Sequence, residues 1–322
     1  MKITFFANPP SFIPDIAKHF ADIHGEGSVN VFIRGDEAKF AQCVQTSDIL
    51  WFEWCNELML YALANFPTRH AKVICRLHSY EAFTDMPGQP DWSKVDHLIL
   101  VNESVKDILR TMGFWDKIQN SCETHIIPNL VKTEDYDLAD ILEKRDKIAY
   151  LGHINYKKDS SLIFPIMEKV LERKLPHRLF SAGEHQDLRY KVMFDRYMET
   201  VSPPNIVFDG HQKEVNLWLK DKKYSLNTSL FESFNYGIAE SMLTGAIPLV
   251  RNWLGSDLAY PNIHTWNTVQ ECVNLIEEFE SLGLEEKRKV QAANRQFIID
   301  TYDFNKVIPR IEELMTPKIK MS

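Results

Sequence analysis

The sequence contains no apolar stretch that approaches the roughly 18 residues of a membrane-spanning helix. The apolar run at its N-terminus is short and ends at Pro9 and Pro10, unlike the hydrophobic segment of a secretory signal peptide. Its five cysteines form no C-x-x-C pair, which disfavours a disulfide framework or a zinc site and favours reduced thiols. We therefore expect a soluble, cytoplasmic protein, whose contact with a membrane, if any, is peripheral.

An excess of positive charge is also lacking. The 322 residues include 37 Lys and Arg against 45 Asp and Glu, which gives a formal net charge of -8. A mildly acidic protein has no overall electrostatic reason to bind nucleic acid, so a nucleic-acid partner is disfavoured. Hydrophobic residues make up 44% of the chain and charged residues 25%, which indicates a globular protein, and the length suits two domains.

Several chemical signatures are missing as well. No G-x-G-x-x-G motif opens a helix after the first expected strand, which argues against a nicotinamide-dependent dehydrogenase. Ser229 and Ser233 lie in no G-x-S-x-G elbow, which argues against a hydrolase. The eleven histidines show no H-E-x-x-H or comparable spacing, so no metal site is predicted. We interpret isolated histidines as structural or surface residues, among them His97, His125 and His177.

What the sequence does contain is a regular alternation of short apolar runs and amphipathic segments. The apolar runs are rich in Val, Ile and Leu, as expected of strands that are buried on both faces. The expected strands cover residues 3–6, 29–33, 49–52, 73–77, 98–101, 148–151, 178–181, 206–208, 224–227 and 247–250. The expected helices cover residues 56–65, 104–112, 162–173, 188–198, 214–219, 236–244, 269–281, 285–299 and 304–314.

This alternation predicts an α/β protein with parallel sheets that are covered by helices. The polar stretch of residues 132–146 is typical of a connection between two such domains. We expect an N-terminal Rossmann-like domain over residues 1–140, to which a helix at about 303–317 returns, and a second Rossmann-like domain over residues 146–300. Ligands of open α/β sheets bind beyond the carboxyl ends of the strands, so the ligand cleft is expected between the domains.

The segment of residues 226–252 carries the most informative chemical pattern. After a strand that ends near Asn227, the sequence predicts a loop with Glu232 and a helix that begins near Asn235 and ends at Gly245. Glu240 then lies about one turn into this helix. The free N–H groups and the partial positive charge of a helix N-terminus suit a diphosphate, and carboxylates on either side could accept hydrogen bonds from sugar and ribose hydroxyls.

This segment resembles the signature of glycosyltransferase family 4, a set of retaining enzymes with the GT-B fold. The matching residues are Glu232, Phe234, Gly237, Glu240 and Gly245-Ala246-Ile247-Pro248. Other segments match in the family's order: residues 95–113, 126–129, 147–159, 205–210 and 301–304. The resemblance implies the GT-B fold, in which two Rossmann-like parallel-sheet domains face each other across a cleft.

The resemblance also implies roles for individual residues. Glu232 would contact the donor sugar, Lys158 would neutralise the leaving diphosphate, and His78 would face the donor sugar from the N-terminal domain. Glu240 would bind the ribose. The remaining implied donor-binding residues are Phe234, Asn235, Tyr236, Gly237, His153 and Arg251. The implied donor is a nucleotide-diphosphate sugar, with UDP- and GDP-sugars favoured, and no cofactor is implied.

The chemistry of the implied reaction agrees with these roles. Cleavage of a glycosyl–phosphate bond builds negative charge on the diphosphate, and fixed cations with helix N–H groups stabilise that charge without a metal. In a retaining enzyme of this kind, the acceptor attacks on the face that the diphosphate leaves. The departing phosphate then takes the acceptor's proton, so no protein nucleophile is required.

The sequence departs from the family's pattern at two places. The family usually has an arginine in the loop after the second domain's first strand, where this sequence has His153. A neutral histidine supplies less positive charge, so compensation is expected from a protonated His153, from Lys157 or from Arg251. The N-terminal glycine-rich loop is replaced by Asn8-Pro9-Pro10-Ser11. That loop often contacts the acceptor, so the acceptor stays open among a glycan, a lipid carrier, a protein and a modified base.

Three further segments have two interpretations each. Asp135-Tyr136-Asp137 matches the D-x-D motif of metal-dependent glycosyltransferases, but it follows no clear strand, and we expect its acids to cap a helix over residues 138–142. Residues 56–66 could touch a membrane or a lipid-linked acceptor, although a helix packed in its domain is favoured. Residues 51–55 (WFEWC) fit a sugar-binding aromatic platform and core packing equally well.

Three classes of function therefore remain. A retaining glycosyltransferase is favoured. The second class is another GT-B enzyme, such as a nucleotide-sugar epimerase or a phosphorylase, although the sequence shows no cofactor-binding lysine site for the latter. The third is a catalytically inactive binding or assembly protein, which His153 in place of arginine would allow.

Overall fold

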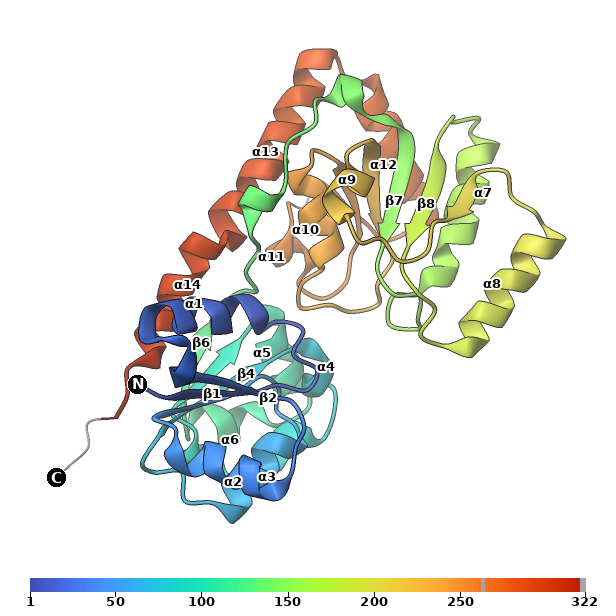
Figure 1. The fold of residues 1–322 in the computed structure, drawn as a ribbon. Helices are drawn as coiled ribbons and strands as arrows, with labels where there is room; N and C mark the ends of the chain where they lie inside the picture. Colours follow the sequence, from blue (N-terminus) through green and yellow to red (C-terminus); the bar gives the residue numbers. More distant parts are fainter. Residues whose placement is uncertain (262–263, 319–322) are drawn as a thin grey trace. The chain divides into compact units, whose positions relative to one another are not determined.

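A computed structural model describes residues 1–261 and 264–318. These residues divide into two compact units (Figure 1). The N-terminal unit contains Met1–Leu130 and the segment from Asn305 onward, and the second unit contains Val131–Phe304. All five cysteines are free thiols, as the sequence predicts. Within the described ranges, no helix combines the length and the hydropathy that crossing a membrane requires.

The N-terminal unit is built on a six-stranded sheet in the order β2-β1-β3-β4-β5-β6. Every pairing in this sheet is parallel. The strands are β1 (Ile3–Phe6), β2 (Val29–Phe32), β3 (Ile49–Phe52), β4 (Lys72–Leu77), β5 (His97–Leu100) and β6 (Glu123–Ile126). The helices are α1 (Pro14–His24), α2 (Glu37–Thr46), α3 (Glu57–Asn65), α4 (Ser79–Ala82), α5 (Glu103–Thr111), α6 (Trp115–Gln119) and α14 (Phe304–Glu312), whose first residue belongs to the second unit.

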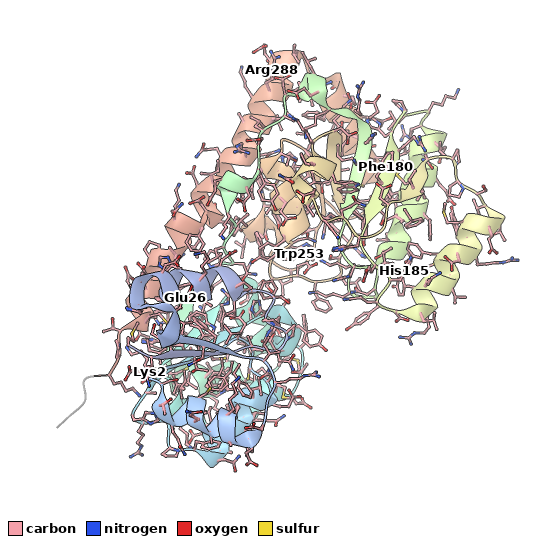
Figure 2. The ribbon with its side chains drawn as sticks, viewed as in Figure 1. Lys2, Glu26, Phe180, His185, Trp253 and Arg288 are labelled. Atoms are coloured by element: carbon pink, nitrogen blue, oxygen red, sulfur yellow. The ribbon has the colours of Figure 1, made fainter. Side chains whose placement is uncertain are left out.

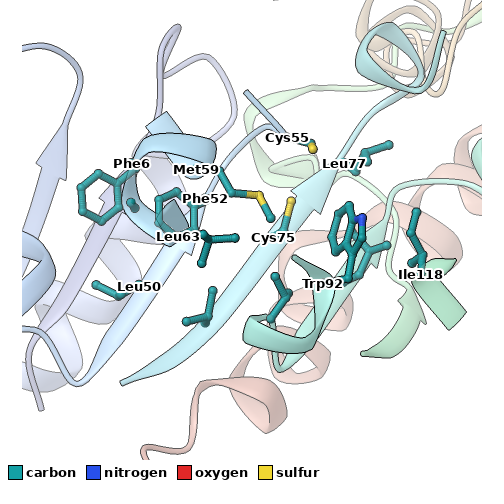
Figure 3. Close-up of a cluster of buried hydrophobic side chains, with 14 of the residues drawn as sticks. Phe6, Leu50, Phe52, Cys55, Met59, Leu63, Cys75, Leu77, Trp92 and Ile118 are labelled. Atoms are coloured by element: carbon teal, nitrogen blue, oxygen red, sulfur yellow. The ribbon is translucent and has the colours of Figure 1, made fainter. Parts of the chain in front are cut away.

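Both faces of the four inner strands of this sheet are buried, which explains their continuous apolar runs. On one face, Phe52 and Cys75 pack against Met59 of α3 (Figure 3). On the other face, the ring of Phe5 lies 6.5 Å from that of Phe20 in α1 and 5.7 Å from that of Trp51. The apolar side of α3 is therefore covered by its own unit, as the sequence favoured.

The second unit has a six-stranded parallel sheet in the order β12-β11-β10-β7-β8-β9. The strands are β7 (Arg145–Leu151), β8 (Arg178–Ala182), β9 (Ile206–Phe208), β10 (Lys222–Asn227), β11 (Ile247–Arg251) and β12 (Thr265–Trp266). The helices are α7 (Ile163–Glu172), α8 (Leu188–Thr200), α9 (Val215–Leu219), α10 (Tyr236–Leu243), α11 (Ser256–Ala259), α12 (Val269–Ser281) and α13 (Leu284–Tyr302). Helix α7 packs beside α12, and α10 packs beside α13. The two sheets confirm the predicted α/β class.

The helix expected over residues 138–142 does not form. A short 3-10 turn, Ile141–Glu143, occurs instead, and Asp140 caps it by accepting a hydrogen bond of 2.9 Å from the N–H of Leu142. Asp135 and Asp137 are exposed and cap no helix there. A capping residue must lie directly before the first turn, and that turn begins later than the sequence suggested.

Candidate functional site

In the second unit, the strand order reverses between the neighbouring strands β7 and β10. If the six strands of this unit are numbered 1 to 6 along the chain and read across the sheet from β9, their order is 3-2-1-4-5-6. This is the strand order of dinucleotide-binding sheets, whose ligands bind beyond the carboxyl ends of the strands at such a switch point. The chain leaves these two strands through residues 152–159 and 228–235. These two loops carry Lys158 and Glu232, the residues that the sequence placed in the site.

Two glycines, one after β8 and one in α10, allow their backbones to approach the carboxyl end of β7 closely. A Cβ atom on Gly183, whose φ is +147°, would lie 2.0 Å from the carbonyl oxygen of Gly152. A Cβ atom on Gly237, in the first turn of α10, would lie 2.9 Å from the carbonyl oxygen of Leu151. The helix N-terminus therefore lies directly against the end of β7, at a distance that a larger residue would not permit.

We expect Gly183→Ala to lower the thermal unfolding midpoint strongly, because the new Cβ atom would overlap the backbone of Gly152 and alanine is strained at a positive φ. The expected loss in the free energy of unfolding is about 3 kcal/mol or more. The matched control is Gly210→Ala: Gly210 also has a positive φ, +68°, but its Cβ would meet no atom within 4 Å. Gly210→Ala is expected to lower the free energy of unfolding by about 1–2 kcal/mol, which is the strain of the positive φ alone. Equal midpoints for the two variants in thermal scans of the full chain would refute the close approach.

Glu232 forms the charged centre of the site. Its side chain is only 4% exposed, and Lys158 Nζ contacts its Oε1 atom directly. Lys157 Nζ lies 3.1 Å from the other oxygen, Oε2. Ser229 donates a further hydrogen bond of 2.9 Å to Oε1. Burial alone would raise the pKa of Glu232, but the two ammonium groups and the hydroxyl outweigh it and hold that pKa below its usual value.

Hydrogen bonds to the backbone of Lys158 fix its position. The N–H of Lys158 donates to Asn155 Oδ1 at 3.0 Å, and its carbonyl accepts from the hydroxyl of Thr228 at 2.6 Å. The next residue, Asp159, has a φ of +42° and pairs with Arg251 at 2.6 Å. The lysine is thus held by the loop before it and by the chain that follows β10, as a preorganised cation requires.

Helix α10 begins as the sequence predicted. Asn235 is its N-cap, and the Oδ1 atom of this residue accepts from the N–H of Ile238 at 3.3 Å. The backbone of Asn235 is also held by Tyr260, whose hydroxyl accepts from its N–H at 3.0 Å and donates to its carbonyl at 2.6 Å. Phe234 is buried in one hydrophobic cluster with Tyr260, Trp253 (Figure 2) and Tyr302. Sequence reasoning missed Tyr260, because no local motif links it to residue 235.

Glu240 lies in the second turn of α10 and is half-buried. Burial raises its pKa, although a hydrogen bond with the phenol of Tyr136 partly opposes that rise. Tyr136 is the middle residue of Asp135-Tyr136-Asp137. That motif therefore contributes its tyrosine to the neighbourhood of Glu240.

The structure distinguishes among the three cations that were expected to replace the missing arginine. His153 is exposed. Arg251 is engaged by Asp159 and by the carbonyl of Thr228, at 2.6 and 3.0 Å. Lys157, with 25% of its side chain exposed, reaches Glu232 from beside Lys158. A second ammonium group, that of Lys157, therefore lies beside Lys158 at Glu232.

His78 lies in the N-terminal unit at the carboxyl end of β4 and is 4% exposed. Its Nε2 atom lies 2.9 Å from Glu53 Oε1, and Arg76 lies 2.7 Å from the same oxygen. Burial alone would raise the pKa of Glu53, but Arg76 and His78 lower it to about 2. The imidazole lies between aromatic rings, with ring centroids 4.8 Å from Phe12 and 4.4 Å from Trp54. Segment 51–55 packs largely in the core, where Trp51, Phe52 and Cys55 are buried, and its Trp54 contacts His78.

No protein-family model matches this sequence, and no curated protein sequence matches it. Solved structures do match it in fold. HepE from Anabaena, in complex with UDP-glucose, aligns with a TM-score of 0.71 and 15% identity over 97% of this chain and 98% of HepE. Sucrose-phosphate synthase from Thermosynechococcus elongatus aligns with a TM-score of 0.74 and 10% identity over 98% of both chains.

A variant of TarM from S. aureus, in complex with fondaparinux, α-GlcNAc-glycerol and UDP, aligns with a TM-score of 0.65 and 15% identity over 83% of this chain. This chain spans only 55% of that longer protein. At such identities the likeness establishes the fold and not the activity. The chain has the GT-B fold of these glycosyltransferases, which confirms the predicted fold class.

Proposed function

We propose that this protein is a retaining, metal-independent glycosyltransferase of family 4 that uses a nucleotide-diphosphate sugar as donor. The observation that carries the proposal is the pair Lys157 and Lys158, held on the buried Glu232 beside the N-terminus of α10. This arrangement places fixed positive charge and helix N–H groups at the switch point of a nucleotide-binding sheet. We favour a UDP-sugar, because HepE and TarM were solved with UDP or UDP-glucose.

In the proposed reaction, Lys158 stabilises the negative charge that develops on the leaving diphosphate, and Lys157 adds to that field. Glu232 orients the donor sugar while it holds both lysines, and Glu240 binds the ribose. Both oxygens of Glu232 are already engaged by cations, which disfavours this carboxylate as a nucleophile. We therefore expect retention through attack on the face that the diphosphate leaves. His78 would approach the donor sugar from the N-terminal unit.

For the acceptor, we propose a chemical class and not a particular molecule. We infer a glycan or a lipid-linked acceptor, and TarM in complex with fondaparinux is a GT-B protein with a glycan bound. The five free thiols agree with a reducing compartment, so we place the protein in the cytoplasm, with peripheral membrane contact if its acceptor is lipid-linked.

The proposal is tested with a thermal-shift panel of UDP, GDP, ADP, CMP and their sugars, each with and without EDTA. We expect UDP and its sugars to raise the midpoint in a saturable way and to the same extent in EDTA, because a ligand that binds only the folded state stabilises it. A shift that EDTA abolishes would overturn the metal-independent mechanism. If no nucleotide shifts the midpoint, a catalytically inactive protein becomes the better interpretation. The donor that does bind is then incubated with candidate acceptors, and the anomeric configuration of the product by NMR tests retention.

A further inference from the structure

A second group of potential ligand atoms lies in the N-terminal unit, on strands β5 and β6. These strands pair in parallel, with His97 opposite Glu123 and Ile99 opposite His125. Paired residues of neighbouring strands face the same side of a sheet, and so do residues two apart on one strand. His97, Glu123 and His125 therefore lie together on one face, at the edge of the sheet that β6 forms.

The three side chains converge on one point. Nδ1 of His97 lies 3.1 Å from Nε2 of His125. The two oxygens of Glu123 lie 3.4 Å from His97 Nδ1 and 3.6 Å from His125 Nε2. Ligand atoms around a tetrahedral zinc ion, at the usual bond lengths of about 2.0–2.2 Å, are about 3.4 Å apart. The His97–His125 and His97–Glu123 separations are close to that spacing, and one ligand atom of each residue can be chosen so that all three lie within 4.8 Å of one another.

We propose that His97, Glu123 and His125 bind a divalent transition-metal ion, with Zn²⁺ as the best fit. Two imidazoles and one carboxylate are a ligand set that zinc uses, with water at the fourth position. The ion would join the edge strand β6 to its neighbour β5. The proposal does not depend on glycosyl transfer, because all three ligands belong to the N-terminal unit and none is a residue of the donor site.

Accessibility of the three residues supports the assignment. The histidine side chains are 12% and 20% exposed and that of Glu123 is 65% exposed, so an ion can enter while the rings stay anchored.

A comparable cluster in the second unit differs from this one in the partners of its carboxylates. Asp146, His177 and Glu280 also bring three ligand-type atoms together. Lys223 Nζ lies 2.5 Å from Asp146 and 3.0 Å from Glu280, so an ammonium group already neutralises those carboxylates. Among residues 1–261 and 264–318, the ion pairs of Glu123 are with the two histidines themselves. We therefore assign a metal to the first cluster only.

The test titrates the full-length, metal-free protein with Zn²⁺ against a chromophoric chelator as competitor. We expect one tightly bound ion per chain, and an affinity at least about 10-fold weaker in both Glu123→Gln and His125→Ala. The control is His211→Ala, which removes an exposed histidine of the second unit and should leave the affinity unchanged. Glu123→Gln keeps the test valid even if His125→Ala folds poorly, because residue 123 is exposed.

A second measurement identifies the ligands. Co²⁺ in place of Zn²⁺ is expected to give the intense visible absorption of a tetrahedral site in the wild type and in His211→Ala, and to lose it in Glu123→Gln. Failure of the wild type to bind one Zn²⁺ would overturn the proposal. Binding that is equally tight in Glu123→Gln and His125→Ala would overturn it too, because the ion would then lie elsewhere. Each shift in the nucleotide panel is the difference between samples with and without nucleotide at the same EDTA content, so a panel in which no nucleotide shifts the midpoint does not bear on this site.

Discussion

Lys158→Ala is expected to lower the kcat of glycosyl transfer by about 10²–10³-fold, the usual effect of removing one preorganised group that stabilises developing charge. The side chain of Lys158 is 20% exposed and anchored on the buried Glu232, and hydrogen bonds hold its backbone on both sides. Its cation therefore needs little reorganisation when charge appears on the diphosphate. The measurement is a steady-state assay with the donor that the nucleotide panel identifies.

Lys157→Ala serves as the matched control. Either substitution leaves Glu232 with one lysine and with Ser229, so both variants should fold with similar unfolding midpoints. Lys157 contacts the oxygen on the other side of the carboxylate, and we expect its loss to cost about 10-fold or less, as for a more remote charge. Equal losses in the two variants would mean that the lysines act only by holding Glu232, which contradicts a separate role for Lys158.

Glu240→Gln and Glu240→Ala are expected to abolish the saturable rise of the unfolding midpoint with nucleotide. A carboxylate that accepts hydrogen bonds from two ribose hydroxyls contributes about 1.5–3 kcal/mol per bond, so its loss weakens binding by about 100-fold or more. The protein without nucleotide should be as stable in Glu240→Gln as in the wild type, because burial disfavours the charged form of this carboxylate. The same thermal-shift panel makes the measurement.

Tyr136→Phe distinguishes the direct contact of Glu240 with the ribose from the hydrogen bond that Tyr136 makes to Glu240. The substitution removes only the phenol hydroxyl that bonds Glu240, and the carboxylate keeps its place on α10. We expect less than about a 5-fold change in nucleotide affinity, since one neutral hydrogen bond contributes about 1 kcal/mol.

A full response to UDP in Glu240→Gln would contradict the prediction for Glu240 and would show that the ribose binds elsewhere.

Local sequence was sufficient wherever a residue's environment depends on its near neighbours. The continuous apolar runs marked ten of the twelve strands that the described residues form, because parallel strands buried on both faces need apolar side chains throughout. Asn235 and Gly245 marked the ends of α10, since an N-cap and a positive φ, here +87°, impose their own residue types. The strand β6 was missed because it lies at the sheet edge, where half-exposed residues such as Glu123 and His125 are tolerated.

The sequence by itself determined the α/β class, the alternation of its elements, and the presence of Glu232 and Glu240 on either side of a helix N-terminus. Only the tertiary structure decided which side chains meet. Lys158 and Glu232 are 74 positions apart, yet they touch because β7 and β10 are neighbours in the sheet. The same holds for His97 with His125, on the neighbouring strands β5 and β6. Strand order and register set these contacts, and both depend on the packing of the whole sheet, which no local spacing encodes.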